Sequence, residues 1–399
     1  MSIADRASAG AGRLLERVAS RAAGPHQSAV VRIGIAFTWL LFLLRELPHR
    51  EDLWGPDSSW GLDLAGPALA ESGGFSVFMW SESDLWFEFC YFLGIAASAA
   101  LLLGWRTRTA SVIFMVMVVS LQSRSQHLGG AGENLIRLVS LYLVLTRCGQ
   151  VWSLDARRAA RRTDAPSDRQ GIGLWLVTGG ALALSTAGGD LDSRGWLIVL
   201  WGLWAVHALW WAVSRRLPGE PRTVLQCAGH LVHNAALLMV MFEVCLIYAS
   251  AGWYKIQGTR WQDGTAVYYT MHLDNYGSWP EVGDLLSSSW TLVLLMTYGT
   301  VLMQVAFPFT VLNRRVKNVL LVCLIAEHVA IGVLMALPFF SMAMIAVDIV
   351  FLPTPFLIAV GDRVGRLRDR VVRRRGAPSP AGEGPARRPQ LVGGAPPAG

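Results

Sequence analysis

The chain has 399 residues, of which 53% are hydrophobic and 16% are charged, and its mean hydropathy is +0.40. Soluble globular domains carry roughly a quarter charged residues, so this composition excludes a soluble globule and predicts an integral membrane protein. The net charge of +7 is gathered in arginine clusters, which are typical of cytoplasmic loops facing anionic lipid rather than of a nucleic-acid-binding groove.

Ten apolar stretches approach the length of about 20 residues that a helix needs to cross the hydrocarbon core of a bilayer. The stretches are 29–46, 85–104, 109–123, 134–148, 171–189, 195–213, 228–252, 289–311, 317–337 and 339–360. Two of them, 109–123 and 134–148, are short. The pattern predicts an all-α fold, a polytopic transmembrane helical bundle of about 9–10 spans, over residues 29–360.

The connections between the stretches alternate between arginine-rich segments and segments rich in acids or tryptophan. By the positive-inside rule, the arginine-rich side is cytoplasmic and holds the N-terminal segment 1–28 and the C-terminal tail. We expect the tail, 361–399, to be basic at first and then disordered, because its end is rich in Pro, Gly and Ala. The bias toward Ala, Gly and Arg indicates a bacterial plasma membrane protein.

Lys255 is one of only two lysines among 35 basic residues, and it ends an apolar run on the predicted outer side. Arginine stays protonated in proteins, whereas a lysine ammonium can lose its proton when it is desolvated. Lys255 is therefore a candidate base. The alternative, an interfacial anchor that snorkels to the membrane surface, is equally compatible with the sequence.

Ionisable groups inside predicted spans are costly, and they indicate either function or structural pairing between helices. They are Arg32, Arg137, His207, His230, His233, Glu243, Glu327, His328 and Asp348. His230 and His233 share a helix face, but no third metal ligand stands at a useful spacing, so we expect a hydrogen-bonded structural pair and no metal site. His328, beside Glu327 at mid-span, is a candidate proton donor or acceptor for a bound ligand.

A glycine-rich segment, 129–137, places Glu133 and Asn134 at the outer start of the fourth predicted helix. A helix N-terminus with these side chains can position a polar ligand. A capped interfacial turn, with the Glu133 carboxylate at the positive end of the helix dipole, is the alternative that the spacing favours.

Three stretches within 28–360 resemble the horizontally transferred transmembrane domain family, whose best-known members are the vitamin K-dependent γ-glutamyl carboxylases. The first is the Tyr-x-x-Ala-Gly-x-x-Lys pattern from Tyr248 through Gly252 to Lys255, which continues to Trp261 and Asp263. The others are the segment 129–137, which is followed by 152–155, and the Glu327–His328 helix, which is followed by Phe339, Phe340 and Met342.

The resemblance implies that Lys255 deprotonates a reduced quinone, vitamin K hydroquinone or menaquinol, which oxygen then converts to an epoxide. In the carboxylases, the strongly basic species so formed removes a proton from a glutamate side chain, and carbon dioxide adds there. By the same resemblance, His328 shares the catalytic site, and the quinone is bound by Tyr248, Gly252, Glu327, Trp261, Asn134 and Glu133. The partners implied are the lipid bilayer and an exported peptide, with no nucleic acid.

The sequence departs from the carboxylases where they carry a His in an Asn-Asn-His run, since it has Glu133 and Asn134 there. It also has no counterpart, after its last predicted helix, of the large domain with which animal carboxylases bind a propeptide. These departures favour quinol oxygenation over glutamate carboxylation. The alternative function is that of a non-catalytic membrane partner in the maturation, export or immunity of a secreted peptide.

Overall fold

The computed structural model describes residues 12, 16, 18–125, 127–161, 169–189, 191, 193–217, 219–273 and 279–376. Every regular element within these ranges is a helix. The chain divides into two compact units, Met1–Thr354 and Pro355–Gly399. All helices before α18 (Thr354–Gly376) belong to the first unit, and the predicted disordered residues 377–399 lie outside the described ranges.

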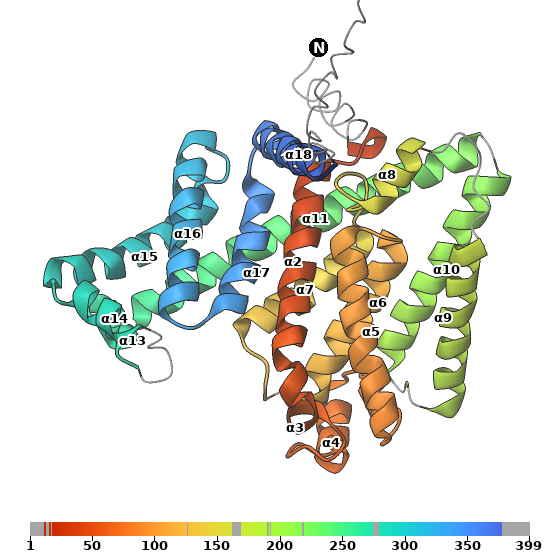
Figure 1. Ribbon diagram of the computed structural model, residues 1–399, viewed down its shortest axis with the longest axis horizontal. Helices are drawn as coiled ribbons and strands as arrows, with labels where there is room; N and C mark the ends of the chain where they lie inside the picture. Colours follow the sequence, from red (N-terminus) through yellow and green to blue (C-terminus); the bar gives the residue numbers. More distant parts are fainter. Residues whose placement is uncertain are drawn as a thin grey trace, which may run out of the picture. The chain divides into compact units, whose positions relative to one another are not determined.

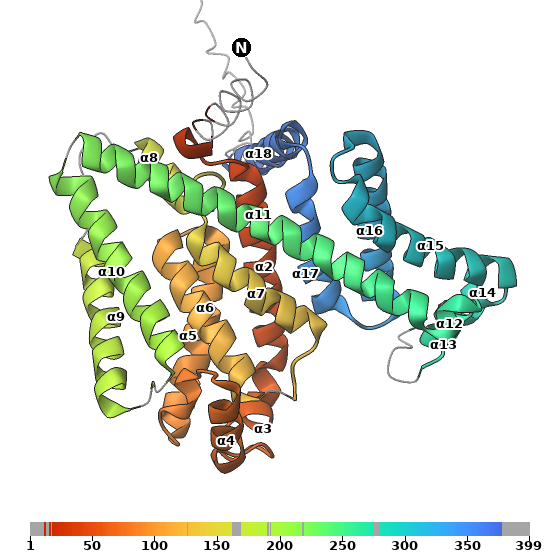
Figure 2. The ribbon, with the colours of Figure 1, turned by 180° about the vertical axis from the view of Figure 1, so that it is seen from behind.

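Four helices of the first unit run side by side and form most of its core (Figures 1 and 2). They are α2 (Pro25–Glu46), α5 (Asp84–Leu103), α6 (Thr107–Arg124) and α7 (Ala131–Leu145). The connection from α2 to α5 contains the short helices η1 (Leu47–His49), α3 (Arg50–Trp54), α4 (Leu62–Ser72) and η2 (Val77–Met79). Buried apolar side chains such as Trp39, Tyr91 and Phe114 fill the space between these helices.

A hairpin of two apolar helices follows the short helix α8 (Leu154–Arg161). The hairpin consists of α9 (Arg169–Gly188) and α10 (Arg194–Arg216), and most of its surface is exposed. Helix α11 (Glu220–Gln257) then runs obliquely across the unit (Figure 2). At 1.5 Å per residue, its 38 residues extend roughly 57 Å, almost twice the ~30 Å hydrocarbon thickness of a bilayer.

The end of α11 leads into the short helices α12 (Thr259–Gln262), α13 (Ala266–Met271) and α14 (Pro280–Ser287). Helices α15 (Trp290–Thr310), α16 (Arg314–Leu334) and α17 (Pro338–Asp348) then pack in succession, and α11 contacts both α15 and α17. Helix α17 also packs against α2 and α7, so it joins this half of the unit to the core.

Arg32 of α2 is fully buried and acts as a structural tie. Its guanidinium donates to the backbone oxygens of Leu101 and Leu102, in the last turn of α5, and of Cys148 and Trp152, beyond α7. The last carbonyls of a helix lack partners within it, so a cation there satisfies them and complements the helix dipole. Of the two roles expected for ionisable groups within spans, Arg32 has the structural one.

The predicted fold class is confirmed: the described chain is helical, and a helix forms at each of the ten predicted stretches. Seven described helices are long and apolar enough to cross a membrane, so the protein is a multi-pass membrane protein. The tenth stretch is not one continuous helix, because α17 gives way to the 3₁₀ turn η3 (Ile349–Phe351) before α18 begins. Pro353 and Pro355 explain the break, since proline lacks the N–H that a helix interior requires.

Candidate functional site

One face of α11 carries the three residues of the predicted lysine motif. Tyr248, Gly252 and Lys255 are spaced by four and three residues, which places them in one row along the helix. Tyr248 and Gly252 are buried, and Lys255, in the last turn, is half-buried. Their neighbours Trp253 and Tyr254 on the opposite side are 63% and 73% exposed. The motif face therefore points into the protein, toward α15, α16 and α17.

The amine of Lys255 binds a neutral amide, which in turn binds a carboxylate. Lys255 Nζ donates to Gln304 Oε1 of α15 at 2.8 Å, and Gln304 Nε2 donates to Glu327 Oε1 of α16 at 2.7 Å. A protonated lysine can only donate and an ionised carboxylate can only accept, so in those charge states the two neighbours fix the orientation of the amide. Lys255 forms no direct ion pair with a carboxylate of the described residues.

Gly252 allows the close approach of α11 and α15 that this contact requires. A Cβ atom at this position would lie 2.6 Å from Val305 Cγ2 and 3.3 Å from the Val305 backbone nitrogen. Val305 directly follows Gln304, so the missing side chain of Gly252 brings that amide within reach of Lys255. Gly252 thus has a helix-packing role in the structure, and its predicted contact with a quinone stays a prediction.

Trp261 lies in α12 and Asp263 directly follows that helix, and the two residues differ in their relation to Lys255. The Trp261 ring centroid is 5.1 Å from Lys255 Nζ, a cation–π distance. Asp263 instead accepts hydrogen bonds from the backbone nitrogen and the hydroxyl of Thr265. The hydroxyl bond is the main cause that lowers the pKa of Asp263 from its ordinary value. The hydrogen bonds of Asp263 therefore stabilise the turn between Asp263 and Thr265.

A second group of polar side chains is buried one layer deeper, where α11, α16 and α17 meet. The Tyr248 hydroxyl donates to Asp348 Oδ2 at 2.8 Å and lies 3.0 Å from His328 Nε2. When Asp348 is ionised it accepts the single hydroxyl proton, and Nε2 is then the protonated ring nitrogen of His328. The other ring nitrogen, Nδ1, is then an acceptor. Neither Nδ1 nor Asp348 Oδ1 has a hydrogen-bond partner among the described residues.

Glu133 and Asn134 lie near this group without contacting it in the described hydrogen bonds. Glu133 Oε2 accepts from the Gly130 backbone nitrogen at the start of α7, which matches the capped turn that the sequence offered as the alternative. Asn134 is exposed. The start of α7 packs closely on α17, since a Cβ atom at Gly132 would lie 2.8 Å from Phe340 Cα. Phe340 in turn meets the His328 ring edge-on, with the ring centroids 5.6 Å apart.

The two histidines near the start of α11 bind backbone atoms. His230 Nδ1 is 2.9 Å from the Ala19 oxygen, and His233 Nε2 is 2.8 Å from the Ala23 oxygen. His233 Nδ1 also accepts from the Arg147 backbone nitrogen at 2.8 Å. These bonds attach the segment before α2 to α11, as expected for a structural pair. Within the described ranges, no three His, Cys, Asp or Glu side chains form a group suited to a metal ion.

The structure also brings in residues to which the sequence assigned no role. Gln304 is the centre of the lysine contact, and its only signal is a polar amide within an apolar stretch. Asp348 was recognisable as an acid inside a span, but nothing in the sequence indicates its bond to Tyr248, 100 residues earlier.

The sequence matches no protein-family model, and comparison with curated proteins and with solved structures gives no significant match either. The class that the fold defines is a multi-pass helical membrane protein.

Proposed function

We propose that this protein is a membrane enzyme that deprotonates a reduced quinone, such as menaquinol, with Lys255 as the base. The observation that carries the proposal is the contact of Lys255 with a neutral amide in place of a carboxylate. A direct carboxylate partner would hold the amine in its charged form. The Gln304 amide accepts a hydrogen bond from either form of the amine, so it positions the nitrogen without fixing its charge.

The protonated amine, once formed, has stabilising neighbours. The Trp261 ring lies at cation–π distance, and Glu327 acts on the ammonium through the Gln304 amide. These groups favour the charged product of proton uptake, which is what a general base requires. The mechanism needs only that Lys255 enters the reaction neutral.

The deeper polar group suits a ligand that carries a hydroxyl. The buried His328 Nδ1 and Asp348 Oδ1 are acceptors without partners, and an unsatisfied buried acceptor is costly unless a ligand or water meets it. Each of these acceptors matches a hydroxyl donor in chemistry, and the Phe340 ring packs edge-on against His328. A reduced quinone, when bound, supplies a hydroxyl proton and the electrons for the reduction of oxygen. Lys255 and His328 accept and hold protons.

The proposed setting is the outer face of a bacterial plasma membrane, with both termini in the cytoplasm. Arginine-rich connections alternate with arginine-poor ones along the chain, which supports this orientation. A quinone would enter from the bilayer, past the exposed aromatic side chains at the end of α11. The further substrate we propose is an exported peptide, carboxylated at glutamate by analogy with the family that the motifs resemble.

The test uses the purified full-length protein in lipid nanodiscs with menaquinol, oxygen and labelled bicarbonate. We expect quinone epoxide to form, and Lys255→Arg, which keeps the charge and removes the titratable amine, to lower its rate by at least about 100-fold. Arg260→Ala, which removes an exposed cation five residues away, is the control and should keep the rate within about twofold. Lys317→Ala is a poorer control, because Lys317 is buried and donates to the Phe351 backbone oxygen.

Equal rates in wild type and Lys255→Arg would refute Lys255 as the base. Absence of epoxide from all samples would refute the enzymatic proposal. Incorporation of labelled carbonate into an added glutamate-containing peptide, measured in the same reaction, separates quinol oxygenation alone from coupled carboxylation.

A further inference from the structure

A cavity of about 1,210 Å³ separates the α9–α10 hairpin from α5 and α6. This volume exceeds the range of about 300–1,000 Å³ that is typical of small-molecule sites. Its walls are mostly apolar, and none of Lys255, Glu327 and His328 lines it. The cavity is therefore separate from the candidate site described above.

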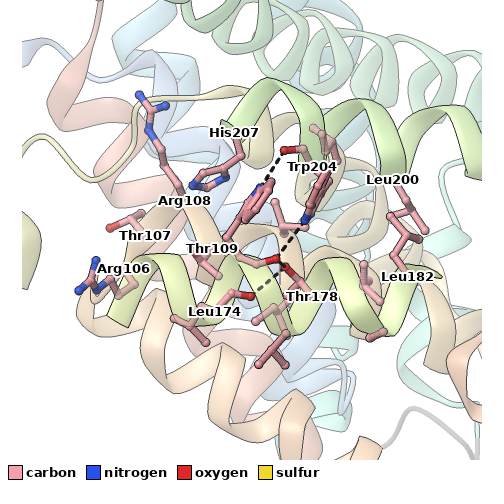
Figure 3. A pocket seen from close by; sticks show the side chains of 18 of the residues that line it. Arg106, Thr107, Arg108, Thr109, Leu174, Thr178, Leu182, Leu200, Trp204 and His207 are labelled. Atoms are coloured by element: carbon pink, nitrogen blue, oxygen red, sulfur yellow. Dashed lines mark hydrogen bonds between the residues drawn. The ribbon is translucent and has the colours of Figure 1, made fainter. Parts of the chain in front are cut away.

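Two tryptophans that line the cavity, Trp175 of α9 and Trp204 of α10, hold the two helices of the hairpin together. Figure 3 shows Trp204 at the cavity. The rings of Trp175 and Trp204 stack with their centroids 4.0 Å apart. Each indole nitrogen donates to the backbone oxygen of the other tryptophan, at 3.1 and 3.0 Å. Gly179 makes room for this pair, since a Cβ atom there would lie 2.6 Å from Trp204 Nε1. The two helices thus form one rigid wall.

Aromatic contacts attach this wall to the rest of the unit on either side of the cavity. Trp196, near the start of α10, packs on Phe75, with the ring centroids 5.5 Å apart. Trp210, near the end of α10, lies against two guanidinium groups, those of Arg108 at 4.4 Å and Arg147 at 5.1 Å from the ring. These contacts hold the hairpin at a distance from α6 and keep the cavity open between them.

The charges of the cavity are gathered at the Trp210 end. The charged lining residues are Arg106, Arg108, Arg147 and Asp155. The Asp155 carboxylate is occupied, because it accepts from the backbone nitrogens of Arg106 and Thr107 and from the Thr107 hydroxyl. Neither Arg108 nor Arg147 forms an ion pair with a described carboxylate, and Arg147 Nε is buried without a hydrogen-bond partner.

The opposite end of the cavity is apolar. Figure 3 shows Arg106 and Arg108 at one end and Leu182 and Leu200 at the other, with Trp204 between them. The lining is completed there by side chains such as Phe89, Leu93 and Val177. The cavity is thus amphipathic along its length, with a positively charged end and an apolar body.

We propose that this cavity binds one anionic phospholipid from the bilayer. The phosphate would lie between the guanidinium groups of Arg108 and Arg147, which form charge-assisted hydrogen bonds with phosphate oxygens. The acyl chains would extend along the apolar wall toward Leu182 and Leu200. Basic pockets between transmembrane helices are a known kind of site for anionic headgroups. The apolar body favours a phospholipid over free inorganic phosphate, and the occupied Asp155 leaves no lining carboxylate for a choline group.

The proposal is tested by native mass spectrometry of the full-length protein, delipidated and then titrated with phosphatidylglycerol. We expect one retained lipid, and we expect Arg108→Ala/Arg147→Ala to weaken its retention by about tenfold or more. Arg157→Ala/Arg158→Ala is the matched control. It removes two exposed arginines of α8 whose side chains do not line the cavity, so it should leave retention unchanged. Phosphatidylcholine should bind at least tenfold more weakly than phosphatidylglycerol.

A second variant separates lipid binding from folding. Ala181→Trp adds a bulky side chain to the apolar wall and leaves all arginines in place, so it should also reduce retention of phosphatidylglycerol. Equal retention by wild type and both cavity variants would overturn the proposal. So would equal retention of the two lipids, or displacement of phosphatidylglycerol by inorganic phosphate alone at equal concentration.

Discussion

Lys255 and Glu327 do not touch, because the side-chain amide of Gln304 lies between them and binds both. Lys255 lies on α11, Gln304 on α15 and Glu327 on α16. Helix α15 packs against both α11 and α16. The arrangement keeps an amine and a carboxylate within one bridging group of each other without a direct ion pair.

Gln304→Glu should convert the bridge into a direct ion pair with Lys255. A carboxylate beside the amine favours the ammonium, so the pH at which epoxidation reaches half its maximum should rise by about one to three units. The measurement is the pH profile of epoxide formation in nanodiscs. Gln257→Glu, at an exposed position two residues beyond Lys255, is the control. An unchanged profile in Gln304→Glu would show that the amide does not govern the protonation of Lys255.

Tyr248→Phe should destabilise the protein through the two partners of the lost hydroxyl. His328 Nε2 and Asp348 Oδ2 would remain buried without their hydrogen bonds, at a cost of about 1–3 kcal/mol for each group. Reversible unfolding in detergent measures the change. Tyr254→Phe, at a 73% exposed position on the same helix, should change the stability by less than about 0.5 kcal/mol. Similar values for the two variants would contradict the buried network.

Gly252→Ala should separate α11 from α15. The added Cβ atom would meet Val305 Cγ2 at 2.6 Å, and overpacking of this kind costs about 1–3 kcal/mol. The control is Gly299→Ala in α15, where a Cβ atom meets nothing within 4 Å and alanine should stabilise the helix by about 0.5–1 kcal/mol. Thermal unfolding checks both signs. Equal stabilisation of the two variants would refute the close approach at Gly252.

Arg32→Met should be among the most damaging single substitutions in the main unit. It would leave four backbone oxygens without the donor that now satisfies them, and each buried acceptor that loses its hydrogen bond costs about 1–3 kcal/mol. The yield of folded protein and its unfolding midpoint measure the effect. Arg45→Met, in the last turn of the same helix, removes an exposed charge and should cost less than about 1 kcal/mol. An unfolding midpoint of Arg32→Met close to that of the wild type would contradict the structural role of the Arg32 hydrogen bonds.

The turn after Trp261 should lose order in acid. The pKa of Asp263 is lowered in the folded protein, so its stabilisation is complete above the unfolded value of about 3.9 and is lost as the pH falls through the lower folded value. Carboxyl NMR titration should show the lowered midpoint. Thr265→Val should move it upward, and Thr265→Ser, which keeps the hydroxyl, should leave it low. An identical midpoint in the valine and serine variants would exclude the hydroxyl as the cause.

The sequence predicts the helices well because crossing a membrane requires long apolar stretches, which can be read without knowledge of packing. Helix interruptions are harder to predict from hydropathy alone. The stretch 339–360 is mostly apolar, yet its helical hydrogen bonding is interrupted around Pro353 and Pro355, between α17 and α18. The extra length of α11 beyond 228–252 was also missed, because its first turns are polar.

The candidate site was predictable only in part. Lys255, Tyr248, Glu327 and His328 stand out as polar groups in or beside apolar stretches. Their pairing depends on which helix faces touch, and periodicity within one helix does not give that information. Gln304 and Asp348 acquire their roles only from the packing of α11 against α15 and α17. The binding of a quinone by Trp261, Glu133 and Asn134 stays a prediction.

The buried position of Arg32 also has a consequence for the synthesis and membrane insertion of the protein. Its four acceptors lie 69 to 120 residues later in the sequence, so α2 leaves the ribosome long before they exist. Until residue 101 has been synthesised none of these acceptors exists, so this cation must be met by water or by lipid headgroups at the membrane surface. The hydrogen bonds that hold α2 in place are complete only once residue 152 has been translated, beyond the end of α7.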